Sequence, residues 1–176
     1  MSVRFMLTPM PQPFHFAFFV RDLASTRRFY GEVLGCREGR STESWVDFDF
    51  FGNQISAHNT GKPTPTLNTG LVEGVPVPMP HFGALLPWDS FQSVADRIRA
   101  AGVAFVLEPR IRYPGQPGEQ ATMFVLDPSG NALEFKSFKH PEQVLLRLCS
   151  KPVTTVARWV SECYHLFSKS RLGDVE

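Results

Sequence analysis

The sequence predicts an α+β fold made of two similar halves, each formed by a strand, a helix and then two or three antiparallel strands. Two apolar segments, His15–Val20 and His81–Pro87, each open with a histidine and have the character of strands. Each is followed by a helical pattern that runs from an aspartate to a glycine thirteen residues later. Strand-like runs joined by turn residues come after each helix. Because the same order occurs twice, we expect a duplicated architecture.

The two helices are predicted at Leu23–Leu34 and Ser90–Ala101. The aspartate before each helix, Asp22 and Asp89, suits the N-cap because its carboxylate accepts hydrogen bonds from free amides of the first turn. A glycine directly after each helix suits the C′ position, where the backbone becomes left-handed. The second helix has the apolar spacing of one buried face, whereas the first is less regular and contains Gly31.

The strands that follow the helices are expected as two runs in the first half and three in the second. These runs are Trp45–Phe51, Gln54–His58, Val103–Glu108, Thr122–Leu126 and Ala132–Phe138. The last two runs of each half are joined by short turns, at Phe51–Asn53 and Asp127–Asn131. Proline fixes φ in such turns, and glycine or asparagine tolerates a positive φ, so both turns favour antiparallel hairpins.

The chain divides into five segments by composition. We expect an extended N-terminal lead (1–13), a first module (14–60), a linker (61–80), a second module (81–139) and a C-terminal extension (140–176). The linker contains five prolines and few large apolar residues, which favours a semi-extended chain. Within the C-terminal extension, 151–169 has the spacing of an amphipathic helix, which we expect to dock on the body of the protein or on a second subunit.

Composition excludes several classes of protein. With 43% hydrophobic and 20% charged residues, the 176-residue chain resembles a soluble globular domain and not a disordered one. A formal net charge of +1 gives no electrostatic reason to expect nucleic acid as a partner, and no apolar run is long enough to span a membrane. Three cysteines without a C-x-x-C pair favour a reducing, cytoplasmic location, and Cys36 is expected to be buried rather than reactive.

Three residues could form a metal site. His15 and His81 open the two halves at equivalent places, and a duplicated unit would bring such positions toward a common centre. Glu134 lies in the last apolar strand, where a buried carboxylate needs a partner. Two imidazoles and one carboxylate suit non-haem Fe(II), and the same ligands can hold Zn, Mn or Ni. The structural alternatives are hydrogen-bonded core histidines and a solvent-facing Glu134 beside Lys136.

Two further residues could move protons. His58 ends the last strand of the first half, close to the place that Glu134 holds in the second half, although Ser56 is the strict equivalent. His58 could therefore be a fourth ligand, an acid/base or a structural residue. Tyr113 precedes the glycine- and proline-rich loop Pro114–Gln120, which suits either a loop over the mouth of a site, with Tyr113 as proton donor, or an ordinary surface hairpin.

Two motifs carry a family resemblance. The pattern H-x5-R-D-L-x5-F-Y-x3-L-G at His15–Gly35 and the run D-P-S-G-N-A-L-E at Asp127–Glu134 resemble the vicinal oxygen chelate superfamily of glyoxalases, bleomycin-resistance proteins and type I extradiol dioxygenases. The resemblance implies two βαβββ modules that form a cupped mixed sheet around one metal. It also implies His15, His81 and Glu134 as ligands.

The resemblance is nearest to small proteins described as extradiol-type dioxygenases. It implies an Fe(II) enzyme that acts on a small catechol-like or vicinal-oxygen substrate, with His58 or Tyr113 as the proton-moving residue. One alternative is a glyoxalase-like lyase or isomerase, although glyoxalase I-like members usually have Glu where this chain has His58. A second alternative is a metal-free binding protein of the bleomycin-resistance type. The cup could close within one chain or between two copies in a homodimer.

Overall fold

The structure is a computed structural model that describes residues 12–61, 68–72 and 74–144. The chain separates into two compact units, Met1–Val144 and Leu145–Glu176, and all the described residues belong to the first. The expected C-terminal amphipathic helix and most of the expected N-terminal lead lie outside the described residues. Within the described ranges, no helix is long and apolar enough to cross a membrane.

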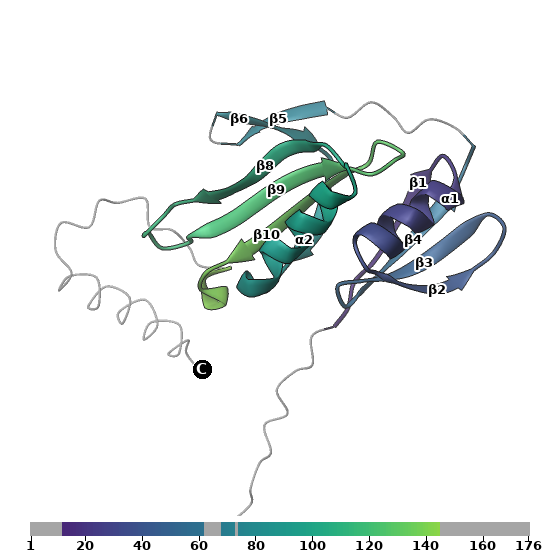
Figure 1. The fold of residues 1–176 in the computed structure, drawn as a ribbon, viewed down its shortest axis with the longest axis horizontal. Coiled ribbons are helices and arrows are strands. Elements are labelled where there is room, and N and C mark those ends of the chain that lie inside the picture. The colour runs from purple at the N-terminus through teal and green to yellow at the C-terminus, as the bar shows by residue number, and fades with distance from the viewer. Residues whose placement is uncertain (1–11, 62–67, 73, 145–176) are drawn as a thin grey trace, which may run out of the picture. The chain divides into compact units, whose positions relative to one another are not determined.

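The first module is a four-stranded mixed sheet with one helical segment (Figure 1). Its elements are β1 (His15–Val20), α1 (Leu23–Arg27), the π-helix η1 (Arg28–Val33), β2 (Arg37–Ser41), β3 (Trp45–Phe50) and β4 (Asn53–Asn59). The strand order is β1-β4-β3-β2, with β1 parallel to β4 and the other pairs antiparallel. Strand β2 was not predicted, because all five of its residues are exposed and it lacks an apolar pattern.

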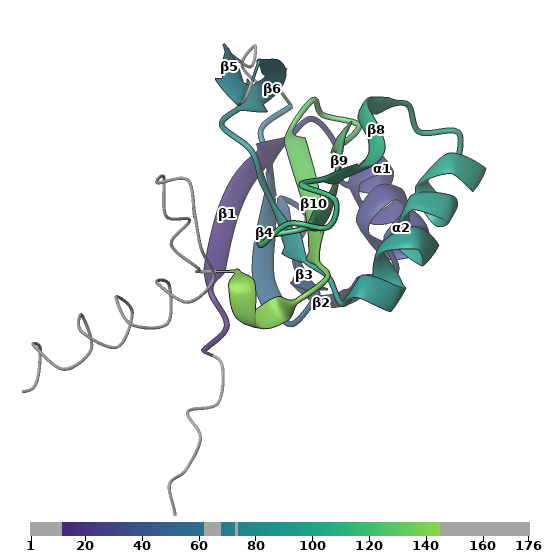
Figure 2. The same ribbon diagram turned by 90° about the vertical axis from the view of Figure 1, so that its left-hand side faces the viewer.

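The second module repeats this connectivity. Its elements are β7 (Phe82–Leu85), α2 (Trp88–Ala100), β8 (Phe105–Arg112), β9 (Gln120–Leu126) and β10 (Ala132–Phe138), followed by the short 3-10 helix η2 (Pro141–Gln143). The strand order is β7-β10-β9-β8, with β7 parallel to β10. Helix α2 packs against β9 and β10 on one face of the sheet (Figure 2). The predicted α+β fold with two βαβββ modules is confirmed.

The linker contains a hairpin that the sequence analysis did not predict. Strands β5 (Asn68–Val72) and β6 (Val75–Met79) pair antiparallel, with Gly74 at φ 76° in the turn. Prolines are tolerated in β6 because Pro76 and Pro78 are two residues apart. Their missing N–H groups therefore lie along one edge of the strand only. The proline count had favoured a semi-extended linker, and the alternating valines of β6 were the overlooked signal.

The two helices begin and end differently from each other. Asp22 caps α1, since its side chain accepts a hydrogen bond from the Ser25 amide at 2.8 Å. The expected N-cap at Asp89 is wrong: α2 begins at Trp88, with Pro87 at the N-cap and Asp89 inside the first turn, where a carboxylate is still favoured by the helix dipole. The first helix continues as a π-helix, which accounts for its irregular apolar spacing.

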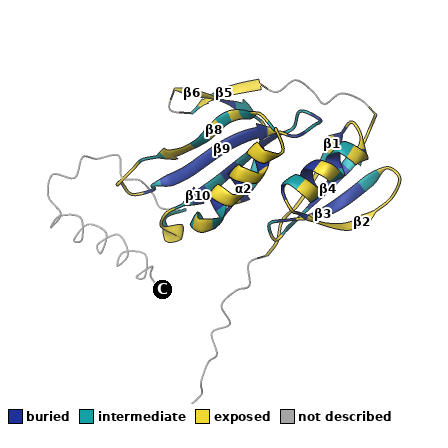
Figure 3. Cartoon of the chain, viewed as in Figure 1, coloured by how far each residue is buried: buried dark blue, intermediate teal, exposed yellow. Residues whose placement is uncertain are grey.

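One phenylalanine-rich core contains buried side chains of both sheets and of the helices that cover them. The Phe50 ring centroid is 5.9 Å from that of Phe82 and 6.2 Å from that of Phe135, so side chains of both modules meet there. Figure 3 shows β9 buried along nearly its whole length, in contrast to β2. Cys36 also belongs to this core, and burial raises the pKa of its thiol to about 12, as expected for an unreactive cysteine.

A buried hydrogen bond also joins the modules. The Tyr30 hydroxyl donates to Asp127 Oδ2 at 3.1 Å, and both residues are buried. Asp127 Oδ1 accepts from the backbone amides of Ser129 and Asn131 at 2.8 Å each. Burial raises the pKa of Asp127 in spite of these hydrogen bonds, and burial also raises the pKa of Tyr30. The turn at Asp127–Asn131 therefore fixes the first helix against the second module.

Candidate functional site

Glu134 lies on the outer face of the second sheet, opposite to the face that α2 covers. Register places Glu134 beside Phe124 of β9 and Gly83 of β7, and places Lys136 beside Thr122. Side chains alternate between the two faces of a strand, so Glu134 and Lys136 share this outer face. Glu134 and Lys136 are therefore neighbours on one face of β10, as the sequence predicted.

A β-bulge in β8 adds two arginines to the same face. Leu107 pairs with Phe124 and Arg110 pairs with Thr122, so three residues of β8 span two residues of β9. Without this register shift, Leu107 and Arg110 would face opposite sides of the sheet. The shift lies next to Pro109, which has no N–H to donate to the ladder. Arg110 and the residue two positions on, Arg112, therefore both line the site.

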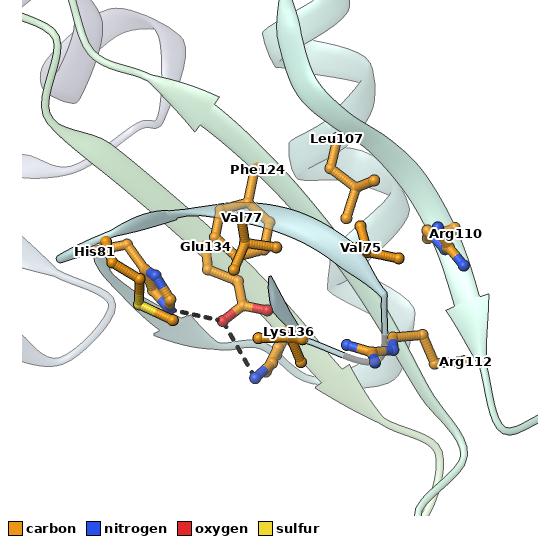
Figure 4. Close-up of a pocket in the computed structure, with 11 residues that line it drawn as sticks. Val75, Val77, His81, Leu107, Arg110, Arg112, Phe124, Glu134 and Lys136 are labelled. Atoms are coloured by element: carbon orange, nitrogen blue, oxygen red, sulfur yellow. Dashed lines mark ion pairs between the residues drawn. The ribbon is translucent and has the colours of Figure 1, made fainter. Parts of the chain in front are cut away.

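These side chains surround a cavity of about 200 Å³ (Figure 4). The floor comes from the outer face of the second sheet, and the β5–β6 hairpin contributes an apolar wall. The lining residues are Val72, Val75, Val77, Met79, His81, Leu107, Arg110, Arg112, Phe124, Glu134 and Lys136. A cavity of this size is small for a ligand site and suits a single-ring molecule, because an apolar cavity of about 150 Å³ holds benzene.

His81 presents one ring nitrogen to Glu134. Its Nδ1 lies 2.7 Å from the carbonyl oxygen of Pro78, which can only accept, so Nδ1 carries a proton. Its Nε2 lies 3.2 Å from Glu134 Oε2. When the imidazole is neutral, two electron-rich atoms face each other at this distance. A cation shared by the two atoms would relieve their repulsion.

Glu134 is held from three sides. Its side chain is 10% exposed, which contradicts the solvent-facing alternative. Thr122 Oγ1 donates to Oε1 at 2.8 Å, and Lys136 Nζ lies 3.1 Å from Oε2. On the neighbouring strand Gly83 leaves no room for a side chain, since a Cβ there would lie 2.6 Å from the Glu134 carbonyl carbon. Backbone packing and hydrogen bonding therefore fix the position of this carboxylate.

His15 has a comparable orientation in the first module. Its Nδ1 lies 3.0 Å from Gln54 Oε1, while Gln54 Nε2 donates to Asp47 Oδ2 at 3.0 Å. The amide oxygen is therefore the atom that faces His15, so Nδ1 donates and Nε2 keeps its lone pair. Burial opposes ionisation of Asp47, but hydrogen bonds from Ser56, Gln54 and Arg40 lower its pKa overall. Both histidines thus direct Nδ1–H at a carbonyl oxygen, as metal-binding imidazoles usually do.

One chain does not unite the three predicted ligands. Within the described residues, no group of three or more His, Cys, Asp or Glu side chains is arranged to hold a metal. The reason lies one residue after each histidine: the Phe16 and Phe82 rings are 4.9 Å apart, in a contact between the two modules in which Phe82 packs against the core and Phe16 is 38% exposed. Alternation then directs His15 and His81 to the outer faces of their sheets, away from that contact.

His58 lies on the same outer face as His15. It pairs with Phe19 of β1 and with Trp45 of β3, whose ring centroid is 6.4 Å away. The equivalent pairing in the second module is Leu85 with Lys136, so His58 corresponds to Lys136 and not to Glu134. Ser56 is the strict equivalent of Glu134, as the sequence analysis expected.

Tyr113 lies at the end of β8 with φ 55°, and the Arg112 guanidinium carbon is 5.5 Å from its ring centroid. Arg112 lines the cavity and Tyr113 does not. Sequence reasoning did not include Lys136, Thr122 or the hairpin in the site. Lys136 was detectable because side chains two residues apart on a strand share one face, and Thr122 was detectable from the pairing of its strand with that of Glu134.

The observed donors fit a divalent metal. Two ligands, each about 2.1 Å from one ion and separated by 90–109°, are about 3.0 to 3.4 Å apart. The 3.2 Å between His81 Nε2 and Glu134 Oε2 lies within this interval. His81 Nε2 and the largely covered Glu134 carboxylate would provide two of the ligands, and His15 Nε2 would provide a third.

Comparison with known proteins identifies the family of the chain. Residues 12–135 match the sequence model of the Glyoxalase/Bleomycin resistance protein/Dioxygenase superfamily. A glyoxalase/bleomycin resistance protein/dioxygenase from Alicyclobacillus acidocaldarius is 28% identical, with 76% of this chain and 96% of that chain covered and a TM-score of 0.63. The fosfomycin resistance protein FosX from Listeria monocytogenes shares the fold at 19% identity, with 81% and 100% covered and a TM-score of 0.56. The chain belongs to the glyoxalase/bleomycin resistance/dioxygenase, or vicinal oxygen chelate, superfamily.

Proposed function

We propose that the chain is a metal-dependent enzyme whose metal is held by His15, His81 and Glu134. The observation that carries the proposal is the common orientation of the two imidazoles, each with Nδ1–H on a carbonyl oxygen and Nε2 left as a ligand. With one carboxylate they form the facial set that suits Fe(II), and the same donors can hold Mn, Ni or Zn.

We infer that a second copy of the chain supplies His15, in a homodimer. Among the strands that the structure describes, β1 and β7 each have a hydrogen-bonded neighbour on one side only, and they carry apolar side chains that are 60% (Phe19) and 56% (Leu85) exposed. Open apolar edges favour pairing with another chain. If β1 of one copy lay beside β7 of the other, two-fold symmetry would form two identical sites. Each site would contain His15 of one copy and Glu134 of the other.

The reaction that we propose is dioxygenation of a small catechol-like substrate. Fe(II) would supply the redox centre beside which two vicinal oxygens of the substrate and O2 are brought together. Thr122 keeps Glu134 oriented, and Phe124 belongs to the apolar lining that limits water. His58 shares a face with His15, so it would enter the same site and accept a substrate proton. Tyr113 is the alternative proton-moving residue.

Two other functions use the same residues. With a metal that does not react with O2, the site would support lyase or isomerase chemistry through a stabilised enediolate. A metal-free binding protein is favoured by one observation, the ion pair of Lys136 Nζ with Glu134 Oε2, because an ammonium group already neutralises that carboxylate. Metal content separates the metal-free binding protein from the two metal-dependent enzymes. Oxygen uptake separates the dioxygenase from the lyase or isomerase.

The test is metal binding under anaerobic conditions, followed by complementation. We expect about one Fe(II) per chain in the unaltered protein and strongly weakened binding in Glu134→Ala and in His15→Ala. When the two variants are mixed, half of the dimers are heterodimers with one intact site each. About one quarter of the unaltered metal content should therefore return. No recovery would refute the shared site, and no binding of Fe, Mn, Ni or Zn by the unaltered protein would refute metal dependence.

A further inference from the structure

The cavity beside Glu134 has a cationic side that the proposed metal chemistry does not use. Three positively charged side chains, Lys136, Arg110 and Arg112, line it together with one carboxylate, Glu134. Lys136 is paired with Glu134, whereas Arg110 has no carboxylate within ion-pair distance among the residues that the structure describes. A guanidinium at the wall of a partly apolar cavity is a strong anion-binding group, because it offers two parallel N–H donors.

Sheet register places Arg110 two strands away from the strand that carries Glu134. Arg110, Thr122 and Lys136 lie in one row across β8, β9 and β10. Two strand spacings of about 4.8 Å separate the backbones of Arg110 and Lys136 by about 10 Å. Figure 4 shows His81, Glu134 and Lys136 toward one end of the cavity and the two arginines toward the other. A ligand held at both ends therefore spans the middle of the cavity.

The space between the two ends is apolar. Val75 and Val77 of the hairpin lie over it, and Leu107 and Phe124 of the sheet lie beneath (Figure 4). The volume of about 200 Å³ accommodates a ring and a small substituent. The lining thus combines a polar end with His81 and Glu134, an apolar middle and a cationic end.

We propose that the cavity selects ligands with an oxyanion, a carboxylate or a phosphonate, attached to a small apolar body, with Arg110 as the anchor of the oxyanion. This inference rests on the proposed function only for the opposite end of the ligand, where the vicinal oxygens would lie. The oxyanion subsite itself needs no metal. It makes the substrate class that of acidic catechols or comparable acidic vicinal-oxygen compounds, in preference to neutral ones.

The bulge in β8 is what creates this subsite. In regular alternation, Leu107 in the cavity would put Arg110 on the core side of the sheet, where an unpaired guanidinium is not tolerated. The two-for-three register brings Leu107 and Arg110 to one face. A bulge beside a cavity is a common means of re-aiming a side chain toward a ligand.

The experiment titrates the chelator-treated full-length protein with benzoate, phenylphosphonate and the neutral isostere benzamide. NMR spectra recorded during each titration give the affinity of each compound. We expect at least one of the two anions to bind about 10-fold more tightly than benzamide or better, and the tighter anion identifies the class of oxyanion. Arg110→Gln should weaken that anion by roughly 10- to 100-fold and leave benzamide unchanged. Arg110→Lys keeps the positive charge but loses the paired N–H donors of the guanidinium. Its affinity for the anion should lie between those of the unaltered protein and Arg110→Gln.

The matched control is Arg37→Gln, which removes the same charge from an exposed strand of the first module. Anion binding should be unchanged in this variant. Equal binding of both anions and benzamide, or full anion binding by a folded Arg110→Gln variant, would overturn the inference. Because the titration is done without metal, a chain that binds no metal at all would refute the proposed function and leave this result standing.

Discussion

The hydrogen bond from Tyr30 to Asp127 allows a quantitative test of how the two modules are joined. The Tyr30→Phe substitution removes the hydroxyl and keeps the ring, which is fully buried against Phe29 and Phe48. Asp127 Oδ2, the oxygen that accepts from Tyr30, still accepts from the side-chain amide of Asn131 at 2.9 Å, so it is not left without a donor. The expected loss is that of one hydrogen bond to a charged acceptor, about 1.5–3 kcal/mol of unfolding free energy.

The assay is urea and thermal denaturation. For a chain of this size, about 2–4 °C of Tm is lost per kcal/mol, so Tm should fall by roughly 3–12 °C. The m-value should not change, because the buried surface is the same. A double-mutant cycle with Asp127→Asn isolates the pair, and a coupling energy near zero would refute the assignment of the bond as the link between modules.

The pH dependence supplies a second check on Tyr30→Phe. The Tyr30 bond favours the ionised form of Asp127, whose pKa burial raises above its ordinary value of 3.8. Without that bond the folded-state pKa of Asp127 rises further. The folded variant then binds more protons than the unfolded chain over a wider range, so its stability falls more steeply as pH rises. The penalty should be largest near neutral pH and smaller in acid, and a penalty independent of pH would contradict this reasoning.

Three further predictions concern the candidate site and the core. Gln54→Leu should weaken Fe(II) binding by about 10- to 100-fold, measured by anaerobic titration, because His15 loses the acceptor of its Nδ1–H; Gln54→Glu should retain most of the affinity. Gly83→Ala should lower Tm and metal affinity together, because the added Cβ collides with the backbone at Glu134. Cys36 should react with a thiol reagent at about pH 8 only after unfolding, and rapid labelling of the folded protein would be inconsistent with its burial.

Local sequence signals were sufficient for most of the fold. Asp22 caps its helix, Gly35 and Gly102 take positive φ after theirs, and the strand at Ala132–Phe138 has the predicted bounds. Each of these features depends on residues close together in the sequence. Strand β2 was missed because all five of its residues are exposed. The β5–β6 hairpin was missed because the prolines of the linker outweighed the alternating valines of β6 in the prediction.

The candidate site was less predictable because it depends on sheet register and on how the two modules pack. Alternation alone groups Glu134 with Lys136, but only the bulge in β8 brings Arg110 to their face, and a bulge has no clear signature in a single sequence. The equivalence of His15 and His81 was readable from the repeat. The direction in which each points relative to the other module was not readable, because it depends on the contact of Phe16 with Phe82 between the two modules.

The duplicated modules differ at the positions that matter for chemistry. Where the second module has Glu134 and Lys136, the first has Ser56 and His58 at the paired positions. The first module therefore offers an oriented imidazole without a carboxylate ligand, and the second offers a carboxylate, an imidazole and a cavity. Because one core holds the two outer faces apart within a chain, neither face is complete alone. Their complementarity is accounted for if the face of one copy meets the other face of a second copy, which is the arrangement that the complementation of His15→Ala with Glu134→Ala would detect.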